Sequence, residues 1–426
     1  MKMAKKVLAV LLSVLFVVGV FTACSSNSGD TKKKEDTTNS ATSKLKVGFI
    51  FLHDKNSTYD LNFIKAADAA CEKLGITGAQ KLYKTNVPEG QEALTAAEDL
   101  ADKGCNIIFA DSFGHEPYII EAAKKYPNVQ FCHSTGTRAH TEGLANYHNA
   151  FASIYEGRYL AGIAAGMKLN EMIEKGEFKK DEAKMGYVGA FTYAEVISGY
   201  TSFFLGARSV CPTATMEVTF TGSWYDETAE KEGAEKLIQN GCVLISQHAD
   251  SMGAPTACEK AGVPNVSYNG STVSVGPNTY IISSRIDWAP YYVYAIQAAM
   301  DGKTIDADWT GTLATKSVVL SDLNTNVAAD GTQAAIDEAM KKLENGELHV
   351  FDVSTFTVTG ENVTADMKTD AEGHLTSYMA DVDNDANMEH DTEVVHDGYF
   401  AESEKRSAPY FDIAIDGIVR LDVNFG

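Results

Sequence analysis

The chain has 426 residues, of which 44% are hydrophobic and 22% charged, and its formal net charge is −22 at pH 7. This acidic balance excludes nucleic-acid binding as the main role, because such proteins need a basic face. The length exceeds the roughly 250–300 residues at which a single core stops growing, so we expect two domains.

The first 23 residues have the features of an export signal. Three lysines precede an apolar run from Val7 to Phe21, which is short for a membrane span of about 20 residues. Small residues then precede Cys24, as in the lipobox of bacterial lipoproteins, although Phe21 stands where Leu is commonest. We expect residues 1–23 to be a signal peptide and Cys24 to carry the lipid. An ordinary signal peptide followed by a chance cysteine is the alternative.

A polar segment follows Cys24. Residues 25–43 are mostly Ser, Thr, Asn, Asp and Lys, with no aromatic residue, so they cannot bury apolar surface. We therefore expect residues 24–44 to form a disordered tether between the lipid and the folded part.

The remaining six cysteines carry no metal-site signature. They show no C-x-x-C spacing, which argues against zinc, and most of them lie in apolar stretches. We expect mostly free, buried thiols, and neither a metal nor a cofactor.

Short apolar runs alternate with helical patterns from Lys46 onward. In the first series, strands are predicted at Val47–Leu52, Asn106–Ala110 and Val129–Cys132, and helices at Asn62–Leu74, Glu92–Ala101 and Pro117–Lys125. Continuous apolar strands alternating with helices predict a buried parallel sheet.

Residues 134–149 are polar and irregular, and a second series follows them. Its helices are predicted at Ile154–Leu169, Glu195–Arg208, Glu227–Asn240 and Gly253–Gly262. Its strands are predicted at Met185–Ala190, Thr215–Phe220, Val243–Ser246 and Asn265–Tyr268, with an extended segment at Tyr280–Ser284. A further helix at Asp287–Asp301, with Pro290 in its first turn, is expected to pack with the first series.

The tail from Val350 to Gly426 is acidic and strand-like, and we interpret it as structural. Asp381, Asp383 and Asp385 resemble the start of a calcium loop, but Ala386 and Thr392 replace the Gly and Glu that such a loop requires. A solvated acidic loop is the simpler interpretation.

Ligands of open parallel sheets bind beyond the carboxyl ends of the strands. In this chain, aromatic and short polar side chains recur directly after the predicted strands. The candidate ligand-binding residues are Tyr59, Asp60, Ser112, Phe113, Phe191, Trp224, Asp250 and Asn269. Flat rings with polar groups at their rim suit a heterocycle with a hydroxylated part, and also a simple sugar. Helix capping by Asp60 and inter-element packing of Trp224 are the competing interpretations.

Catalytic sequence patterns are absent. The chain has no G-x-S-x-G, no H-E-x-x-H and no P-loop. We therefore expect a binding protein and no catalytic residues.

The chain resembles the basic membrane protein (BMP) family of solute-binding lipoproteins from about Lys46 to Gly311. The motifs that carry the resemblance are Val47–Ile50 with Tyr59, Tyr155–Gly162, Gly186–Phe191, Leu205–Val210, Ser223–Asp226, Gln247–Ser251 and Trp288–Tyr292. The resemblance implies a type I periplasmic-binding-protein fold, in which two Rossmann-like lobes joined by crossover strands close on a ligand in the cleft between them. It also implies an ABC transporter permease as partner.

Members of this kind bind purine nucleosides or bases. By position, Tyr59 and Trp224 match the two aromatic residues that stack on the base in the family. Asn269 stands where the family usually has an Asp that holds the ribose, and Ser284 or Arg285 stands where some members have a Lys ligand. These departures leave the ribose contacts open.

We therefore expect a monomeric extracytoplasmic receptor of an ABC importer, lipid-anchored to the cell membrane, that binds a purine nucleoside or nucleobase by stacking and hinge closure. Lobe 1 would comprise residues 45–150 and about 285–315, and lobe 2 residues 151–284 and about 316–426. The alternatives are a receptor for a sugar or other polar metabolite, a secreted nucleoside-processing enzyme, and an adhesin or signalling lipoprotein. A nucleoside hydrolase would need a calcium-binding Asp cluster after the first strand, which residues 53–56 do not supply.

Overall fold

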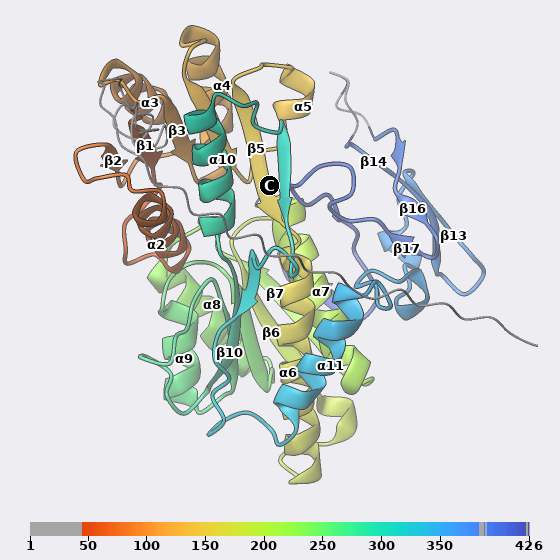
Figure 1. Cartoon of the computed structure of the whole chain (residues 1–426). Coiled ribbons are helices and arrows are strands. Elements are labelled where there is room, and N and C mark those ends of the chain that lie inside the picture. The colour runs from red at the N-terminus through yellow and green to blue at the C-terminus, as the bar shows by residue number, and fades with distance from the viewer. Residues whose placement is uncertain (1–44, 383–386, 388–389, 423–424, 426) are drawn as a thin grey trace, which may run out of the picture.

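The computed structural model describes residues 45–382, 387, 390–422 and 425 of the chain. Within these residues the strands form two large sheets, one above the other in Figure 1, and two small sheets in the tail. We call the six-stranded sheet with its helices the first lobe and the seven-stranded sheet with its helices the second lobe. The expected signal peptide, Cys24 and the tether lie outside the described residues.

The first lobe has the strand order β11-β5-β4-β3-β1-β2, and all its neighbouring strands are parallel. Its strands are β1 (Val47–Ile50), β2 (Lys81–Lys84), β3 (Ile107–Ala110), β4 (Gln130–Ser134), β5 (Tyr147–Ala152) and β11 (Asp308–Gly311). Its helices are α2 (Thr58–Lys73), α3 (Gln91–Asp102), α4 (Glu116–Lys125), α5 (Ala139–Glu142) and α10 (Ala289–Asp301). Every residue of β1 and β3 is buried, which explains their uninterrupted apolar sequence.

The second lobe has the strand order β12-β10-β9-β8-β6-β7-β18, and only β12 runs antiparallel to its neighbour in this sheet. Its strands are β6 (Lys184–Gly189), β7 (Thr215–Phe220), β8 (Leu244–His248), β9 (Asn265–Tyr268), β10 (Tyr280–Ile286), β12 (Val318–Leu320) and β18 (Ile418–Arg420). Its helices are α6 (Ile154–Glu174), α7 (Ala194–Val210), α8 (Glu227–Gln239), α9 (Gly253–Ala261) and α11 (Thr332–Glu344).

The chain passes between the lobes three times, from β5 to α6, from β10 to α10 and from β11 to β12. After the second passage, Trp288 stacks on Phe63 of α2 with ring centroids 4.5 Å apart, and Tyr292 lies 4.5 Å from Phe109 of β3. These contacts confirm that the helix after Asp287 packs with the first series.

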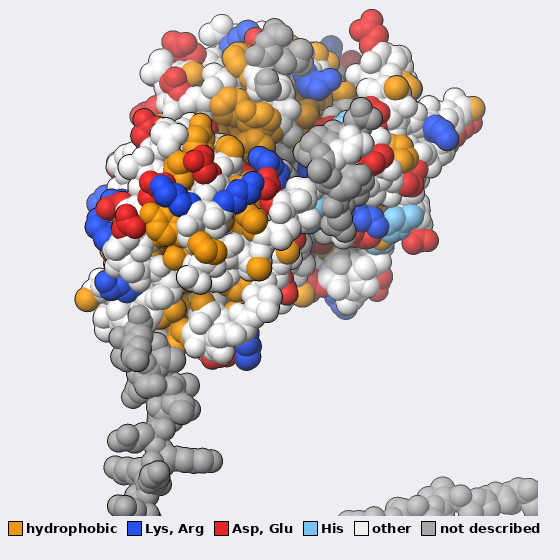
Figure 2. Space-filling model, turned by 90° about the horizontal axis from the view of Figure 1, so that it is seen from above, with side chains coloured by type: hydrophobic (Ala, Val, Ile, Leu, Met, Phe, Trp, Pro, Cys, Tyr) orange, Lys and Arg blue, Asp and Glu red, His pale blue; other side chains and the backbone are white. Residues whose placement is uncertain are grey.

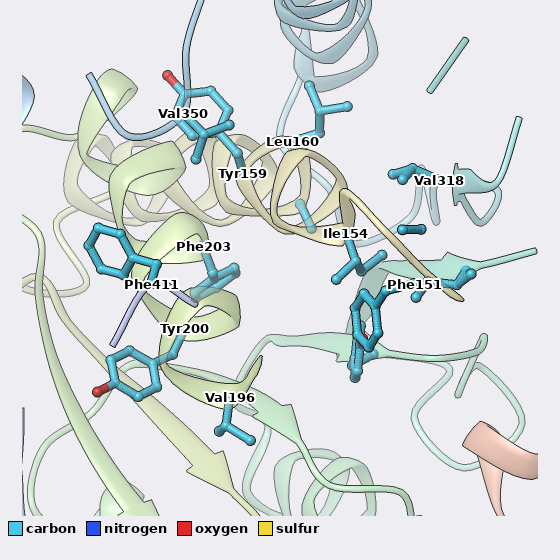
Figure 3. Packing of buried hydrophobic residues seen from close by; sticks show 14 of the residues in the cluster. Phe151, Ile154, Tyr159, Leu160, Val196, Tyr200, Phe203, Val318, Val350 and Phe411 are labelled. Atoms are coloured by element: carbon cyan, nitrogen blue, oxygen red, sulfur yellow. The ribbon is translucent and has the colours of Figure 1, made fainter. Parts of the chain in front are cut away.

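Helices α6 and α7 approach each other closely through two glycines. A Cβ on Gly162 would lie 2.1 Å from the carbonyl oxygen of Phe203, and one on Gly206 would lie 2.0 Å from that of Tyr159. Only glycine fits at such an approach. Figure 3 shows Tyr159 on one of these helices and Phe203 and Tyr200 on the other, within the same buried cluster.

The tail packs onto the second lobe. Its strands are β13 (Met367–Thr369), β14 (Leu375–Ala380), β15 (Thr392–Glu393), β16 (Val395–His396) and β17 (Tyr399–Phe400). The buried Phe411 stacks on Phe351 at 4.2 Å and lies beside Phe203 and Tyr200 of α7 in Figure 3. Strand β18 then extends the second sheet beside β7. Of the calcium-like segment, Asp383, Asp385 and Ala386 lie outside the described residues.

Several elements differ from the sequence-based expectation. Helix α2 begins at Thr58, four residues before its predicted start at Asn62, because the side chain of Ser57 caps it by accepting a bond from the Asp60 amide. The segment 134–149 was expected to be irregular, but it contains α5 and the start of β5. The prediction for the cysteines is confirmed, since the six described cysteines are free and buried.

The surface of the described part is of mixed charge where Figure 2 shows it. Lys and Arg side chains alternate with Asp and Glu over the face seen from above. None of the helices that the structure describes is long and apolar enough to span a membrane.

Candidate ligand-binding site

A small cavity lies between the two lobes. Its lining comes from both of them: the first lobe contributes Leu52, Tyr59, Ser112, Phe113 and Thr135, and the second Glu195, Trp224, His248, Asp250, Tyr268 and Asn269. Most of these residues end a parallel strand or directly follow one, where such sheets bind their ligands. The cavity brings together six of the eight candidate residues, and Asp60 and Phe191 are not in its lining.

Neighbouring groups fix the ring of Tyr59 in the first lobe. Its hydroxyl donates a hydrogen bond of 2.6 Å to the backbone carbonyl of Asp111, and its ring lies 4.8 Å from that of Phe63. Burial, with Glu195 as the next contributor, raises the pKa of Tyr59 well above its usual value. The side chain is therefore a neutral aromatic wall whose hydroxyl proton is engaged.

Trp224 forms part of the opposite wall, in the loop after β7. Its ring lies 5.0 Å from Phe191 in an edge-to-face contact and 6.1 Å from Tyr193. Asp226 fixes the end of this loop by capping α8, where its carboxylate accepts bonds from the amides of Thr228 and Ala229. Phe191 thus supports Trp224 from behind the lining.

Asp250 and Asn269 form the polar part of the second lobe's wall. The amide of Asn269 donates to a carboxylate oxygen of Asp250 at 2.9 Å. Burial, and after it the charges of Glu230 and Asp60, raises the pKa of Asp250 well above the usual range, which favours its protonated form. Asn269 has φ 64°, a left-handed conformation that Asn tolerates better than most residues.

Asp60 lies in the first turn of α2 and is fully buried. Its carboxylate accepts a 2.7 Å bond from the backbone amide of His53, and Ser57, not Asp60, caps the helix. Burial and the neighbouring Asp60 charge raise the pKa of Asp111. The structure therefore places Asp60 beneath the lining, where it holds the loop after β1.

Five lining residues were not among the candidates: Leu52, Thr135, Glu195, His248 and Tyr268. His248 and Tyr268 are the last residues of β8 and β9, so the rule of strand ends could have found them. Glu195 was hidden in a predicted helix, and Thr135 lies in the segment that was expected to be irregular.

The two lobes are in contact around the cavity. The amide and hydroxyl of Thr58 donate to the carbonyl of Asp250 at 3.1 and 3.0 Å, and the side chain of Asn62 donates to the carbonyl of Asn269 at 2.6 Å. The rings of Phe113 and Tyr193 also meet across the lobes at 4.9 Å. The lobes are thus closed. Among the residues that the structure describes, no three His, Cys, Asp or Glu side chains are grouped to hold a metal ion.

Comparisons with known proteins agree with this architecture. Residues 49–350 match the family described as ABC transporter substrate-binding protein PnrA-like. A purine-binding protein of Brucella abortus is 31% identical over 315 residues, covering 73% of this chain and 84% of that protein. A candidate ABC transporter glucose-binding protein of Haloferax volcanii is 34% identical over 261 residues, covering 61% of this chain and 62% of that protein.

Solved structures share the fold. A solute-binding protein of an ABC transporter system from Aeropyrum pernix aligns with a TM-score of 0.61 at 17% identity, covering 74% of this chain and 94% of that one. A second solute-binding protein of an ABC transporter system, from Conexibacter woesei, aligns with a TM-score of 0.58 at 21% identity. The alignment covers 72% of this chain and 98% of that one. The fold is the type I periplasmic-binding-protein fold, as predicted. The chain belongs to the PnrA-like family of ABC transporter substrate-binding proteins and is an extracytoplasmic solute-binding protein.

Proposed function

We propose that the protein binds a purine nucleoside or nucleobase between its lobes and presents it to the permease of an ABC importer. The observation that carries this proposal is the cavity between the lobes, with Tyr59 on one lobe and Trp224 on the other. Flat aromatic walls are suited to a flat heterocycle, because every base has a π-face on which such rings stack. The similarity to a purine-binding protein supports the same ligand class.

In this proposal Tyr59 and Trp224 stack on the base. Phe113 adds a third aromatic side chain to the lining, while Ser112, Asp250 and Asn269 supply the polar contacts. Asp60 and Phe191 do not line the cavity in this proposal. Asp60 holds the loop after β1, and Phe191 packs against Trp224.

Binding is coupled to hinge closure in this proposal. Each lobe supplies one side of the cavity, so a ligand contacts both only when they are together. The three passages of the chain between the sheets would serve as the hinge. We propose lobe limits of residues 45–150 with about 285–315, and 151–284 with about 316–426, which the strand order supports.

A sugar is the second candidate ligand. The Haloferax volcanii relative supports it, and a sugar could use the same aromatic and polar lining. A thermal-shift screen against purine nucleosides, bases and hexoses separates the two. A ligand at a hundred times its dissociation constant should add about 2.7 kcal/mol of stability. Stabilisation by purines and not by hexoses is expected, and the reverse result would replace the purine by a sugar.

We also propose that the ligand leaves unchanged and that the protein is no enzyme. The family of transport receptors and the absence of catalytic motifs support this. Chromatography after prolonged incubation with the bound nucleoside should recover it intact, whereas release of free base would contradict the proposal.

The protein is proposed to be a monomer anchored by a lipid on Cys24, after removal of residues 1–23. The apolar run, the small residues before Cys24 and the polar segment after it support this anchor. Cys24→Ala should release the protein from the membrane fraction or leave it unprocessed. A variant that stays membrane-bound and is normally processed would disprove the anchor.

A further inference from the structure

The hydrogen-bonding groups around the cavity differ in how far they are engaged within the protein. The Tyr59 hydroxyl donates to the Asp111 carbonyl, the Ser112 hydroxyl donates to Glu89 at 2.6 Å, and the Asn269 amide donates to Asp250. The donors of these three side chains are therefore partly or wholly used within the protein. A ligand must find its remaining partners elsewhere on the lining.

Thr135 is one free group. The residue is 3% exposed, and its hydroxyl has no hydrogen-bond partner in the described structure. It also has φ 75°, which is an outlier for a β-branched residue and strains the backbone. Such strain at a cavity-lining residue is typical of a functional position.

Glu195 is a second group with hydrogen-bonding capacity left over. It lies in the first turn of α7, and its side chain is 11% exposed. In the described part of the chain its ion-pair partner is His248, whose Nε2 lies 3.6 Å from the carboxylate, and no lysine or arginine pairs with it. Burial lowers the pKa of His248, which favours the neutral imidazole. A carboxylate has about four acceptor sites on its two oxygens, so this one contact leaves acceptors for the ligand.

The position of Glu195 is fixed from behind. The ring of His248 lies 4.3 Å from the ring of Tyr268, and a Cβ on Gly199 would lie 2.6 Å from its Nδ1. Glycine at position 199 lets the imidazole sit against α7 beside Glu195. Glu195 also acts electrostatically on Tyr59, across the cavity in the other lobe.

We infer that Glu195 and Thr135 select the base by its hydrogen-bonding edge, favouring 6-oxopurines with a ring N–H over adenine; this rests on the proposed function. A carboxylate offers only acceptors, while a hydroxyl can donate. Guanine presents N1–H and N2–H₂ side by side, which match two carboxylate oxygens, and its O6 can accept from Thr135. Hypoxanthine presents N1–H and O6. Adenine turns an acceptor, N1, toward the carboxylate.

The preference should be large because the bonds involve a charged group in a buried place. Such bonds contribute about 1.5–3 kcal/mol each, which corresponds to roughly 10- to 150-fold in affinity. Guanosine and inosine should therefore bind at least 10-fold more tightly than adenosine.

Calorimetric titration of guanosine, inosine and adenosine into the protein and its variants tests this. Glu195→Gln should reduce the guanosine-to-adenosine affinity ratio at least 10-fold, because its amide can donate to adenine N1. Glu195→Asp keeps the carboxylate and should keep the direction of the preference. The matched control is Glu227→Gln, which neutralises an exposed glutamate in the first turn of α8 and should leave the ratio unchanged.

The failures are distinguishable. Melting curves first establish that the variants are folded. The role of Glu195 would be overturned if purines bind without preference, or if Glu195→Gln leaves the guanosine-to-adenosine affinity ratio unchanged. Either result would leave the proposed purine binding intact. Binding of hexoses with no binding of any purine would overturn the proposed function itself and the selection with it.

Discussion

Tyr59 and Trp224 line the cavity from opposite lobes, and neighbouring groups hold both rings. The hydroxyl of Tyr59 is tied to the carbonyl of Asp111, and Trp224 lies against Phe191. Six of the eight candidate residues could be predicted because side chains that follow parallel strands meet at one edge. Thr135 could not be, since its importance rests on a backbone conformation that no sequence pattern reveals.

Substitution of Trp224 tests the stacking wall. Base-on-aromatic stacking contributes roughly 1–3 kcal/mol per base, so Trp224→Ala should weaken nucleoside binding about 5- to 150-fold. Trp224→Phe should retain most of the affinity, because it keeps an aromatic face. If Trp224 only packs between elements, both variants will melt at a lower temperature while their affinity, measured by calorimetry in the folded state, hardly changes.

At the scale of elements, the strands that the sequence predicted are the interior ones. The strands without a prediction include β2, β11 and β12, which lie at sheet edges and are only partly buried. An edge strand lacks the continuous apolar sequence of a strand buried on both faces. Strand β5 is interior but polar, because His148 and Asn149 are buried with hydrogen-bond partners such as Gln130 and the amide of Ala139. Burial of paired polar groups leaves no hydrophobic pattern to read.

The tail carries a pH dependence of stability. The carboxyl of Glu402 is buried and accepts a 2.8 Å bond from the amide of Tyr410, and burial raises its pKa to about 8. The folded protein holds the Glu402 proton more tightly than the unfolded chain does. The stability that this proton contributes is therefore complete below about pH 4.5 and is lost as the pH rises through about 8. Unfolding free energy should therefore fall between pH 5 and pH 7, by roughly 1–3 kcal/mol from this group.

Urea unfolding of the protein and of Glu402→Gln at both pH values measures this effect. The variant keeps an oxygen to accept from Tyr410 but has no proton to lose, so its stability should depend less on pH. Glu361→Gln, at an exposed position of the tail, is the control. Equal pH dependence in Glu402→Gln and the unsubstituted protein would show that Glu402 does not carry the effect.

At the scale of the molecule, length predicted two domains, and the alternation of strands and helices predicted their parallel sheets. What the sequence could not give was the contact between the lobes, because the bonds of Thr58 and Asn62 go to backbone carbonyls of Asp250 and Asn269. Such bonds need no particular side chain on the partner lobe, so the sequence of that lobe does not indicate them.

The bond between Asn62 and the second lobe should stabilise closure over the ligand. Asn62→Ala removes one net hydrogen bond of about 0.5–1.5 kcal/mol, so the affinity should fall about 2- to 13-fold, mainly through faster dissociation. Asn170→Ala is the matched control, because the amide of Asn170 donates at 2.8 Å to the carbonyl of Val210 within one lobe. Surface plasmon resonance measures the association and dissociation rates separately. Unchanged dissociation in Asn62→Ala would mean that this bond does not hold the lobes closed.

The central claim is that this receptor takes a purine into the cavity between its lobes, and calorimetric titration of the purified protein with guanosine and, in parallel, with glucose tests it most directly. The account predicts saturable one-to-one binding of the nucleoside and no binding of glucose at the same concentrations. Saturable binding of glucose with no heat from any purine nucleoside or base would contradict it.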